Sequence, residues 1–228
     1  MSASNYSPAV GAALSYAANA HVTQRRKGKT EWYLSHLLRV AALVMRHGGD
    51  EVDVIAGLLH DCPEDQGGQT RLDEIAKIFG ESVAAIVTDC SDSLTTDPDH
   101  KAPWLERKLA HLRHLADLSV SGSRSLLVIV CDKLANLEDI VNDVHAHERA
   151  GKNPGDAVQI VLNRFNGGVN GTIAYYTAVY EITKASVSPD ASAAFRDLLL
   201  QVAEPPTNMG RQPEEILRSF AEATADPN

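Results

Sequence analysis

The sequence has few cysteines and no long apolar run. Its three cysteines, Cys62, Cys90 and Cys131, are odd in number and widely spaced, with no CxxC pair. This pattern supports neither a disulfide framework nor a cysteine zinc site, and it favours buried free thiols. The longest strongly apolar run, 126–131, is much shorter than the roughly 20 residues of a membrane-spanning helix. The first ten residues also lack the basic-then-apolar layout of a signal peptide, so we expect a cytoplasmic protein with no membrane partner.

Cations are also scarce. Lys and Arg total 21 against 30 Asp and Glu, which gives a formal net charge of −9. The field of such a molecule repels a nucleic-acid backbone, so we expect no nucleic-acid partner. One local exception is Arg25-Arg26-Lys27-Gly28-Lys29, with four cations in five residues. This cluster can receive a polyanionic phosphate, or it can simply be a solvated loop.

The composition is that of a globular, helical chain. Of the 228 residues, 44% are hydrophobic and 22% are charged, and apolar residues recur at the 3.6-residue spacing of helices. No segment shows the sustained two-residue alternation of a half-buried strand. The predicted helices are 8–21, 32–46, 51–61, 72–79, 81–90, 104–115, 123–134, 137–147, 156–165, 172–185, 191–202 and 213–223.

We predict an all-α fold, a single helical bundle of about ten helices. The bundle and its functional site are expected to occupy residues 1–203. From about Glu204 onward Pro, Asn, Gly and Gln become frequent, so residues 204–228 are predicted to form a linker and a short, loosely packed C-terminal helix.

Polar residues interrupt an apolar helix at its end. The adjacent His60 and Asp61 follow the apolar run 54–59, where they would cost several kcal/mol unless they are paired or bound to a metal. Glu64 and Asp65 come within the next four residues and would project toward the same place if the turn stays helical. On their own, these two carboxylates would be read as an exposed acidic turn. Four polar groups in six residues indicate a bound cation.

Two further polar residues lie on apolar helix faces. His36 lies among apolar residues at helical spacing, and Asp132 follows the apolar run 126–131. A lone His36 would more often be a core histidine, but together with His60, Asp61 and Asp132 it completes a mixed nitrogen and oxygen set. Such ligands suit Mn²⁺, Fe²⁺ or Zn²⁺ better than Mg²⁺ or Ca²⁺. Four protein ligands on a six-coordinate ion leave places for water and phosphate, which points to phosphoester or phosphoanhydride hydrolysis.

The order of these four residues resembles that of the HD-domain metal-dependent phosphohydrolases. Further segments resemble the hydrolase domain of the stringent-response alarmone synthetase/hydrolase family, and the chain is similar to the stand-alone small alarmone hydrolases. The similarity extends over about residues 10–185. The matching segments are His21-x-x-Gln24-x-Arg26-Lys27, Tyr33-x-x-His36, Leu58-Leu-His-Asp-x-x-Glu64-Asp65, Phe79-Gly80 and Asp132-Lys-Leu-x-Asn136.

This resemblance implies an activity and a set of roles. It implies removal of the 3′-pyrophosphate from the guanine nucleotide (p)ppGpp by a water activated on Mn²⁺, with Fe²⁺ or Zn²⁺ as the other candidate ions. The implied metal ligands are His36, His60, Asp61 and Asp132, and Glu64 and Asp65 would activate or position the water. The implied substrate contacts are Arg26 and Lys27, with Arg25 as the alternative base-stacking arginine, and Asn136.

Alternatives remain open at this stage. Asn136 can instead cap a helix that begins at Leu137, because Asn is a preferred N-cap. Many family members have an arginine where this chain has Glu138, and a carboxylate there would repel a phosphate. The chain could therefore act on another nucleotide phosphate, or it could be a catalytically silent module that binds nucleotides. The sequence does not indicate an oligomeric state.

Overall fold

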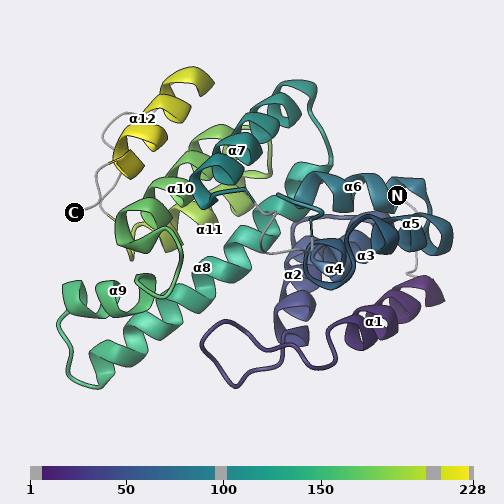
Figure 1. Cartoon of the computed structure of the whole chain (residues 1–228), viewed down its shortest axis with the longest axis horizontal. Coiled ribbons are helices and arrows are strands. Elements are labelled where there is room, and N and C mark those ends of the chain that lie inside the picture. The colour runs from purple at the N-terminus through teal and green to yellow at the C-terminus, as the bar shows by residue number, and fades with distance from the viewer. Residues whose placement is uncertain (1–6, 96–101, 204–211, 226–228) are drawn as a thin grey trace. The chain divides into compact units, whose positions relative to one another are not determined.

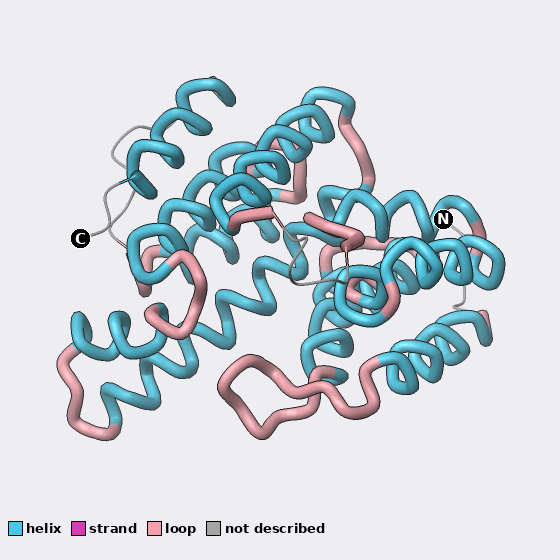
Figure 2. The backbone as a smooth tube through the Cα atoms, in the orientation of Figure 1, coloured by secondary structure: helices cyan, strands magenta, loops and turns pink. Residues whose placement is uncertain are grey.

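The computed structural model describes residues 7–95, 102–203 and 212–225, and within them the chain forms twelve helices (Figure 1). Between these helices the described residues form loops (Figure 2). One isolated β-bridge joins Arg25 and Trp32. The first six helices are α1 (Pro8–Ala20), α2 (Leu34–Arg46), α3 (Glu51–Leu59), α4 (Cys62–Gln66), α5 (Gly68–Phe79) and α6 (Glu81–Cys90). The other six are α7 (Trp104–Ser121), α8 (Ser125–Arg149), α9 (Pro154–Leu162), α10 (Gly168–Thr183), α11 (Pro189–Leu199) and α12 (Pro213–Ala225).

Local sequence signals determine where several helices begin. The Ser7 side chain accepts a hydrogen bond from the backbone of Ala9, and Pro8 follows at the first position of α1. Asp50 and Asp53 form a reciprocal capping box at the start of α3. Each of these devices satisfies backbone N–H groups that have no partner inside the helix.

The chain divides into two compact units. The first comprises residues 1–101 together with 127–132 of α8, and the second comprises 102–126 and 133–228. Helix α8 therefore contributes a short stretch near its N-terminal end to the first unit and its remaining residues to the second. In the first unit α3 packs against α1, α2 and α6, while α5 packs against α4 and α6.

Helix α3 is the core element of the first unit. Its residues 53–59 are all buried, so this helix has almost no solvent-facing side. At the crossing of α2 and α3, Gly57 allows close approach, because a Cβ there would lie 3.4 Å from Val44 and 3.6 Å from Ala41. His60, which directly follows this buried helix, therefore lies in the interior and not on the surface.

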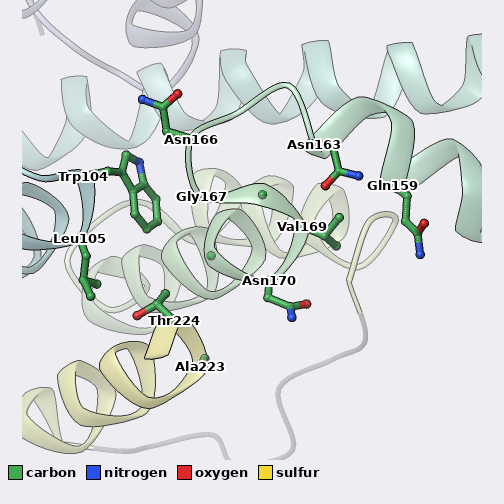
Figure 3. Close-up of a pocket in the computed structure, with 12 residues that line it drawn as sticks. Trp104, Leu105, Gln159, Asn163, Asn166, Gly167, Val169, Asn170, Ala223 and Thr224 are labelled. Carbon is green, nitrogen blue, oxygen red and sulfur yellow. The ribbon is translucent and has the colours of Figure 1, made fainter. Parts of the chain in front are cut away.

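The second unit is built around α10, which packs against α7, α9, α11 and α12. The indole of Trp104 rests on the start of α10, where a Cβ at Gly167 would lie 2.6 Å from its ring. Beside it lies a cavity of about 490 Å³, lined by Trp104, Thr224 and several side-chain amides, including those of Asn163 and Asn170 (Figure 3). Helix α12 buries Ile216 and Phe220.

The all-α prediction is confirmed, and the positions of most predicted helices agree with the structure. One expectation was wrong. The predicted helices 123–134 and 137–147 are a single helix, α8, so Asn136 does not cap a helix start. The linker part of the predicted tail, 204–211, lies outside the described residues, and the proposed domain boundary stays a prediction. None of the described helices is long and apolar enough to cross a membrane.

Candidate functional site

Three buried side chains of the first unit converge on one point. His36, His60 and Asp132 each offer one ligand atom, and these atoms all lie within 4.8 Å of one another. The exposed fractions of the three residues are 1%, 2% and 7%. His36 Nε2 is 3.1 Å from Asp132 Oδ1, and His60 Nε2 is 3.6 Å from the same oxygen. Two imidazoles and a carboxylate are thus gathered in a low-dielectric interior.

Three separate elements supply this cluster. His36 lies in the first turn of α2, on the face that also buries Val40 and Leu43. His60 is the residue that follows α3, and Asp132 lies in the short stretch of α8 that belongs to the first unit. His36, His60 and Asp132 are buried because the apolar side chains beside them on these elements are buried in the core.

The hydrogen bonding of His60 tests whether this cluster fits a metal. His60 Nδ1 is 2.9 Å from the Gly57 carbonyl oxygen and donates to it, which leaves the lone pair on Nε2 of the neutral ring. Among the described residues, Nε2 has no hydrogen-bond partner, although it lies 2.9 Å from Asp61 Oδ2. A lone pair that faces carboxylate oxygens requires a proton or a cation between them. The donor set therefore fits a divalent metal ion.

Electrostatics lead to the same conclusion. Burial lowers the pKa of His60, but the negative charges of Asp61 and Asp132 beside the ring outweigh it and raise this pKa well above its ordinary value. Burial also opposes the charge on Asp61, yet His60 and His36 hold the pKa of Asp61 well below its usual range. The pocket therefore favours a positive charge between these groups.

Asp61 lies beside the cluster and has its own positioning contact. Its Oδ2 is 3.5 Å from His36 Nε2, and it accepts a hydrogen bond of 2.6 Å from the Tyr33 hydroxyl. Tyr33 comes one helical turn before His36. The structure thus brings all four predicted metal ligands together, and it adds Tyr33, which appeared in the matching segments without an assigned role.

Glu64 and Asp65 lie on α4, directly after the cluster. Glu64 Oε2 accepts a hydrogen bond of 3.3 Å from the backbone N–H of Asp92, and Asp65 Oδ2 accepts one of 2.7 Å from Gln24 Nε2. Partial burial of its carboxyl group and the nearby charge of Asp61 raise the pKa of Asp65. Both carboxylates are held by specific donors, and they do not form a simple solvated turn.

The basic cluster forms a loop between α1 and α2, closed by backbone hydrogen bonds between 24 and 33 and between 26 and 31. The Arg25 guanidinium carbon lies 3.1 Å from the centre of the exposed Trp32 ring. That of Arg26 lies 5.6 Å from the centre of the Tyr33 ring. Because Tyr33 contacts Asp61, Arg26 is on the side of the loop that faces the ligand cluster, whereas Arg25 is stacked on Trp32.

The other two predicted substrate contacts are Lys27 and Asn136. Lys27 is an exposed residue of the same loop. Asn136 lies on α8, one helical turn beyond Asp132, in the second unit. Both substrate roles stay predictions.

Sequence reasoning missed a set of residues that support the carboxylates. His21 and Gln24 were quoted only as part of the matching pattern, and Gln66 was not considered. Their side chains meet each other and Asp65. Their spacing gave no signal of the contacts with Asp65 and Gln66, because these join residues 41 and 42 positions apart in the chain.

Comparison with known protein families identifies the arrangement. A family model described as "HD domain" matches residues 13–156, which is more than half of the chain. The chain belongs to the HD domain family. The matched range contains every ligand of the cluster and both carboxylates of α4, and membership of this HD domain family implies that the cluster is a divalent metal site.

Curated relatives share part of this HD domain. The chain is 37% identical over 131 residues to the guanosine-3′,5′-bis(diphosphate) 3′-pyrophosphohydrolase MESH1 of Mus musculus and to that of Homo sapiens. Each match covers 56% of this chain and 67% of the relative. The chain also resembles a solved structure titled as a metazoan ortholog of SpoT that hydrolyses ppGpp, with a TM-score of 0.57 and 23% identity. That match covers 95% of this chain and 98% of the solved one, and it shows a shared fold.

Proposed function

We propose that the protein is a metal-dependent hydrolase that removes the 3′-pyrophosphate from (p)ppGpp. The observation that carries this proposal is the convergence of His36, His60 and Asp132 beside Asp61, in a chain whose relatives are named for that reaction. A cytoplasmic location, expected from the sequence, is part of the proposal.

The metal would be held by His36, His60, Asp61 and Asp132. A set of two imidazoles and two carboxylates favours Mn²⁺, with Fe²⁺ and Zn²⁺ as alternatives. When bound, such an ion supplies Lewis acidity, because it neutralises phosphate charge and lowers the pKa of water. Tyr33 holds Asp61 in place by its hydrogen bond, as supporting residues do for metal ligands in general.

Glu64 and Asp65 would handle the attacking water. They lie on α4, immediately after the ligands His60 and Asp61, and each is oriented by a hydrogen bond from elsewhere in the first unit. In the proposed reaction one carboxylate accepts the proton of the water and the other orients it toward phosphorus. The pyrophosphate leaves, and the ribose 3′ oxygen takes up a proton.

The basic loop would bind the nucleotide. Arg26 is on the ligand side of this loop, so we assign it to the phosphates or to the face of the guanine. Lys27 would add charge along the same anion. Arg25 would extend the stacking surface of Trp32, and Asn136 would contact the ribose or waters at the metal.

A nucleotide panel tests the proposal. Purified protein is stripped of metal, reloaded with Mn²⁺, Fe²⁺ or Zn²⁺ separately, and incubated with ppGpp, pppGpp, 2′- and 3′-phosphorylated nucleotides and nucleoside monophosphates. We expect pyrophosphate release from ppGpp and pppGpp, fastest with Mn²⁺. Orthophosphate release from other nucleotides, with none of the expected pyrophosphate from ppGpp, would show that the substrate is another nucleotide phosphate. Tight ppGpp binding without turnover would indicate a catalytically silent binding module.

A further inference from the structure

A chain of hydrogen bonds ends on Asp65. Gln24 Nε2 donates to Asp65 Oδ2 at 2.7 Å. At the other end of the same amide, Gln24 Oε1 accepts from Gln66 Nε2 at 2.5 Å and lies 2.7 Å from His21 Nδ1. His21 is 2% exposed and stacks on Tyr33, with ring centres 4.9 Å apart. Of the residues that surround Gln24, His21 belongs to the interior of the first unit, whereas Gln66 is half-buried and Asp65 is exposed.

These contacts fix the direction of the Gln24 amide. Its oxygen faces two nitrogen donors, so its NH₂ group must face the carboxylate of Asp65. His21 Nδ1 carries the hydrogen, and the opposite ring nitrogen, Nε2, lies 3.4 Å from the Cys62 sulfur, which donates a thiol hydrogen to it. Burial lowers the pKa of His21, which keeps its ring neutral and suited to this arrangement. If the Gln24 amide were flipped, its oxygen would face the Asp65 carboxylate and its NH₂ group would face the donors of His21 and Gln66.

The hydrogen bond from Gln24 matters for the orientation of Asp65, because the carboxylate of Asp61 lies nearby. Asp65 lies one turn after Asp61 on α4, and its backbone N–H donates to the Asp61 carbonyl at 3.0 Å. Two carboxylates this close repel each other, and Asp65 is exposed enough to rotate toward water. The segment 21–33 supplies neutral donors to both, because Tyr33 donates to Asp61 and Gln24 donates to Asp65. The Tyr33 hydroxyl also interacts with Asp65 and, like Gln24, lowers its pKa. A neutral donor orients a carboxylate without cancelling its charge.

We propose that Gln24, itself oriented by His21 and Gln66, is a positioning residue that holds Asp65 toward the reacting water. This inference rests on the proposed hydrolase function, and it gives the His21-x-x-Gln24 segment a physical role. Gln24 acts through Asp65 and contacts neither the metal ligands nor the substrate. Its loss should therefore slow the chemical step while leaving metal content and nucleotide affinity nearly unchanged.

Two substitutions and one control test this role. Gln24→Met keeps the volume of the side chain and removes the amide, whereas Gln24→Glu keeps its shape and replaces the donor by a second carboxylate. The control is Gln69→Met, since Gln69 Nε2 also donates to an aspartate, Asp73, at 2.8 Å, but on the exposed surface of α5. We expect kcat to fall about tenfold or more in both Gln24 variants, with KM within twofold, bound metal unchanged and no change in Gln69→Met.

Crystal structures of the metal-free wild type and of both Gln24 variants supply a readout that does not depend on turnover. We expect one Asp65 side-chain conformer in the wild type and a rotated carboxylate in the variants. If Asp65 keeps its place in both variants, or if kcat stays within twofold, the positioning role is wrong. A wild type that hydrolyses no nucleotide would refute the proposed function instead, and the Asp65 conformers would still decide the positioning role. Because the shape-preserving Gln24→Glu should fold even if Gln24→Met does not, either variant alone is decisive.

Discussion

At the scale of single residues, the site combines two kinds of carboxylate. Asp61 and Asp132 lie against buried imidazoles, while Glu64 and Asp65 are oriented by a backbone N–H and a side-chain amide. A cation that binds both imidazole and carboxylate would stabilise the buried charges of Asp61 and Asp132. The second pair keeps its charge free for proton transfer. This difference predicts different consequences of mutation.

Replacing Asp61 by Ala should abolish both metal content and turnover, because the imidazoles of His36 and His60 lose the carboxylate that they face. Replacing Glu64 by Gln should keep the metal and lower kcat by about 10² or more if Glu64 is the general base. Metal analysis of the purified variants beside steady-state kinetics checks both outcomes. Loss of metal from the Glu64 variant as well would make Glu64 a ligand and not a base.

At the scale of secondary-structure elements, α2 and the turn before α3 are in close contact at Gly49. A Cβ at Gly49 would lie 3.0 Å from the backbone oxygen of Val44 and even closer to the Val44 side chain. Backbone atoms cannot move aside as a flexible side chain can. This turn sets the relative placement of the helices that carry His36 and His60.

We therefore expect Gly49→Ala to reduce the free energy of unfolding by about 1–3 kcal/mol, the usual cost of overpacking. Gly11→Ala is the matched control, since a Cβ at Gly11 would have no neighbour within 4 Å and Gly11 is exposed on α1. That change should stabilise the protein by about 0.5–1 kcal/mol, because alanine has the better helix propensity. Urea unfolding followed by circular dichroism measures both. Equal stability of the two variants would contradict the described turn.

The sequence predicted these elements well where an apolar stripe marks them, as in α2 and α6. It missed the first turns of α5 and α10, because the glycine and polar residues at 68–71 and 168–171 carry no apolar period. Helix α4 has five residues, too few to show a period at all. The polar Asn136 suggested a break in α8, where the structure has an uninterrupted helix.

The proximity of His36, His60, Asp61 and Asp132 could be predicted because these polar residues stood out on apolar helix faces. The contacts of Gln24 and Tyr33 could not, because they depend on how a loop folds back on α4.

At the scale of the whole molecule, the proposed metal would connect distant parts of the chain. Its ligands come from α2, from the end of α3 and from residues 127–132 of α8, and a ligand that binds only the folded state stabilises that state. We expect Tm to fall on dialysis against a chelator and to recover when Mn²⁺ is added. At a free Mn²⁺ concentration 1,000 times Kd, the ion should add about 4 kcal/mol to the free energy of unfolding.

The same stabilisation should shrink as pH falls. Without metal, the carboxylates raise the pKa of His60, so a proton competes with the ion for Nε2, and more strongly at lower pH. Thermal unfolding at several pH values, with and without Mn²⁺, measures the difference. The Asp61→Ala variant should show no shift with Mn²⁺, and a shift of wild-type size in that variant would place the ion elsewhere.

The path of α8 limits how this protein can be divided. Because residues 127–132 complete a unit that otherwise ends at 101, no single cut in the chain separates the two units into intact pieces. A fragment that stops before α8 would lack Asp132 and with it one-quarter of the proposed ligand set. Truncated variants should therefore retain α8, and exchange of segments between relatives should be tolerated poorly across 102–132.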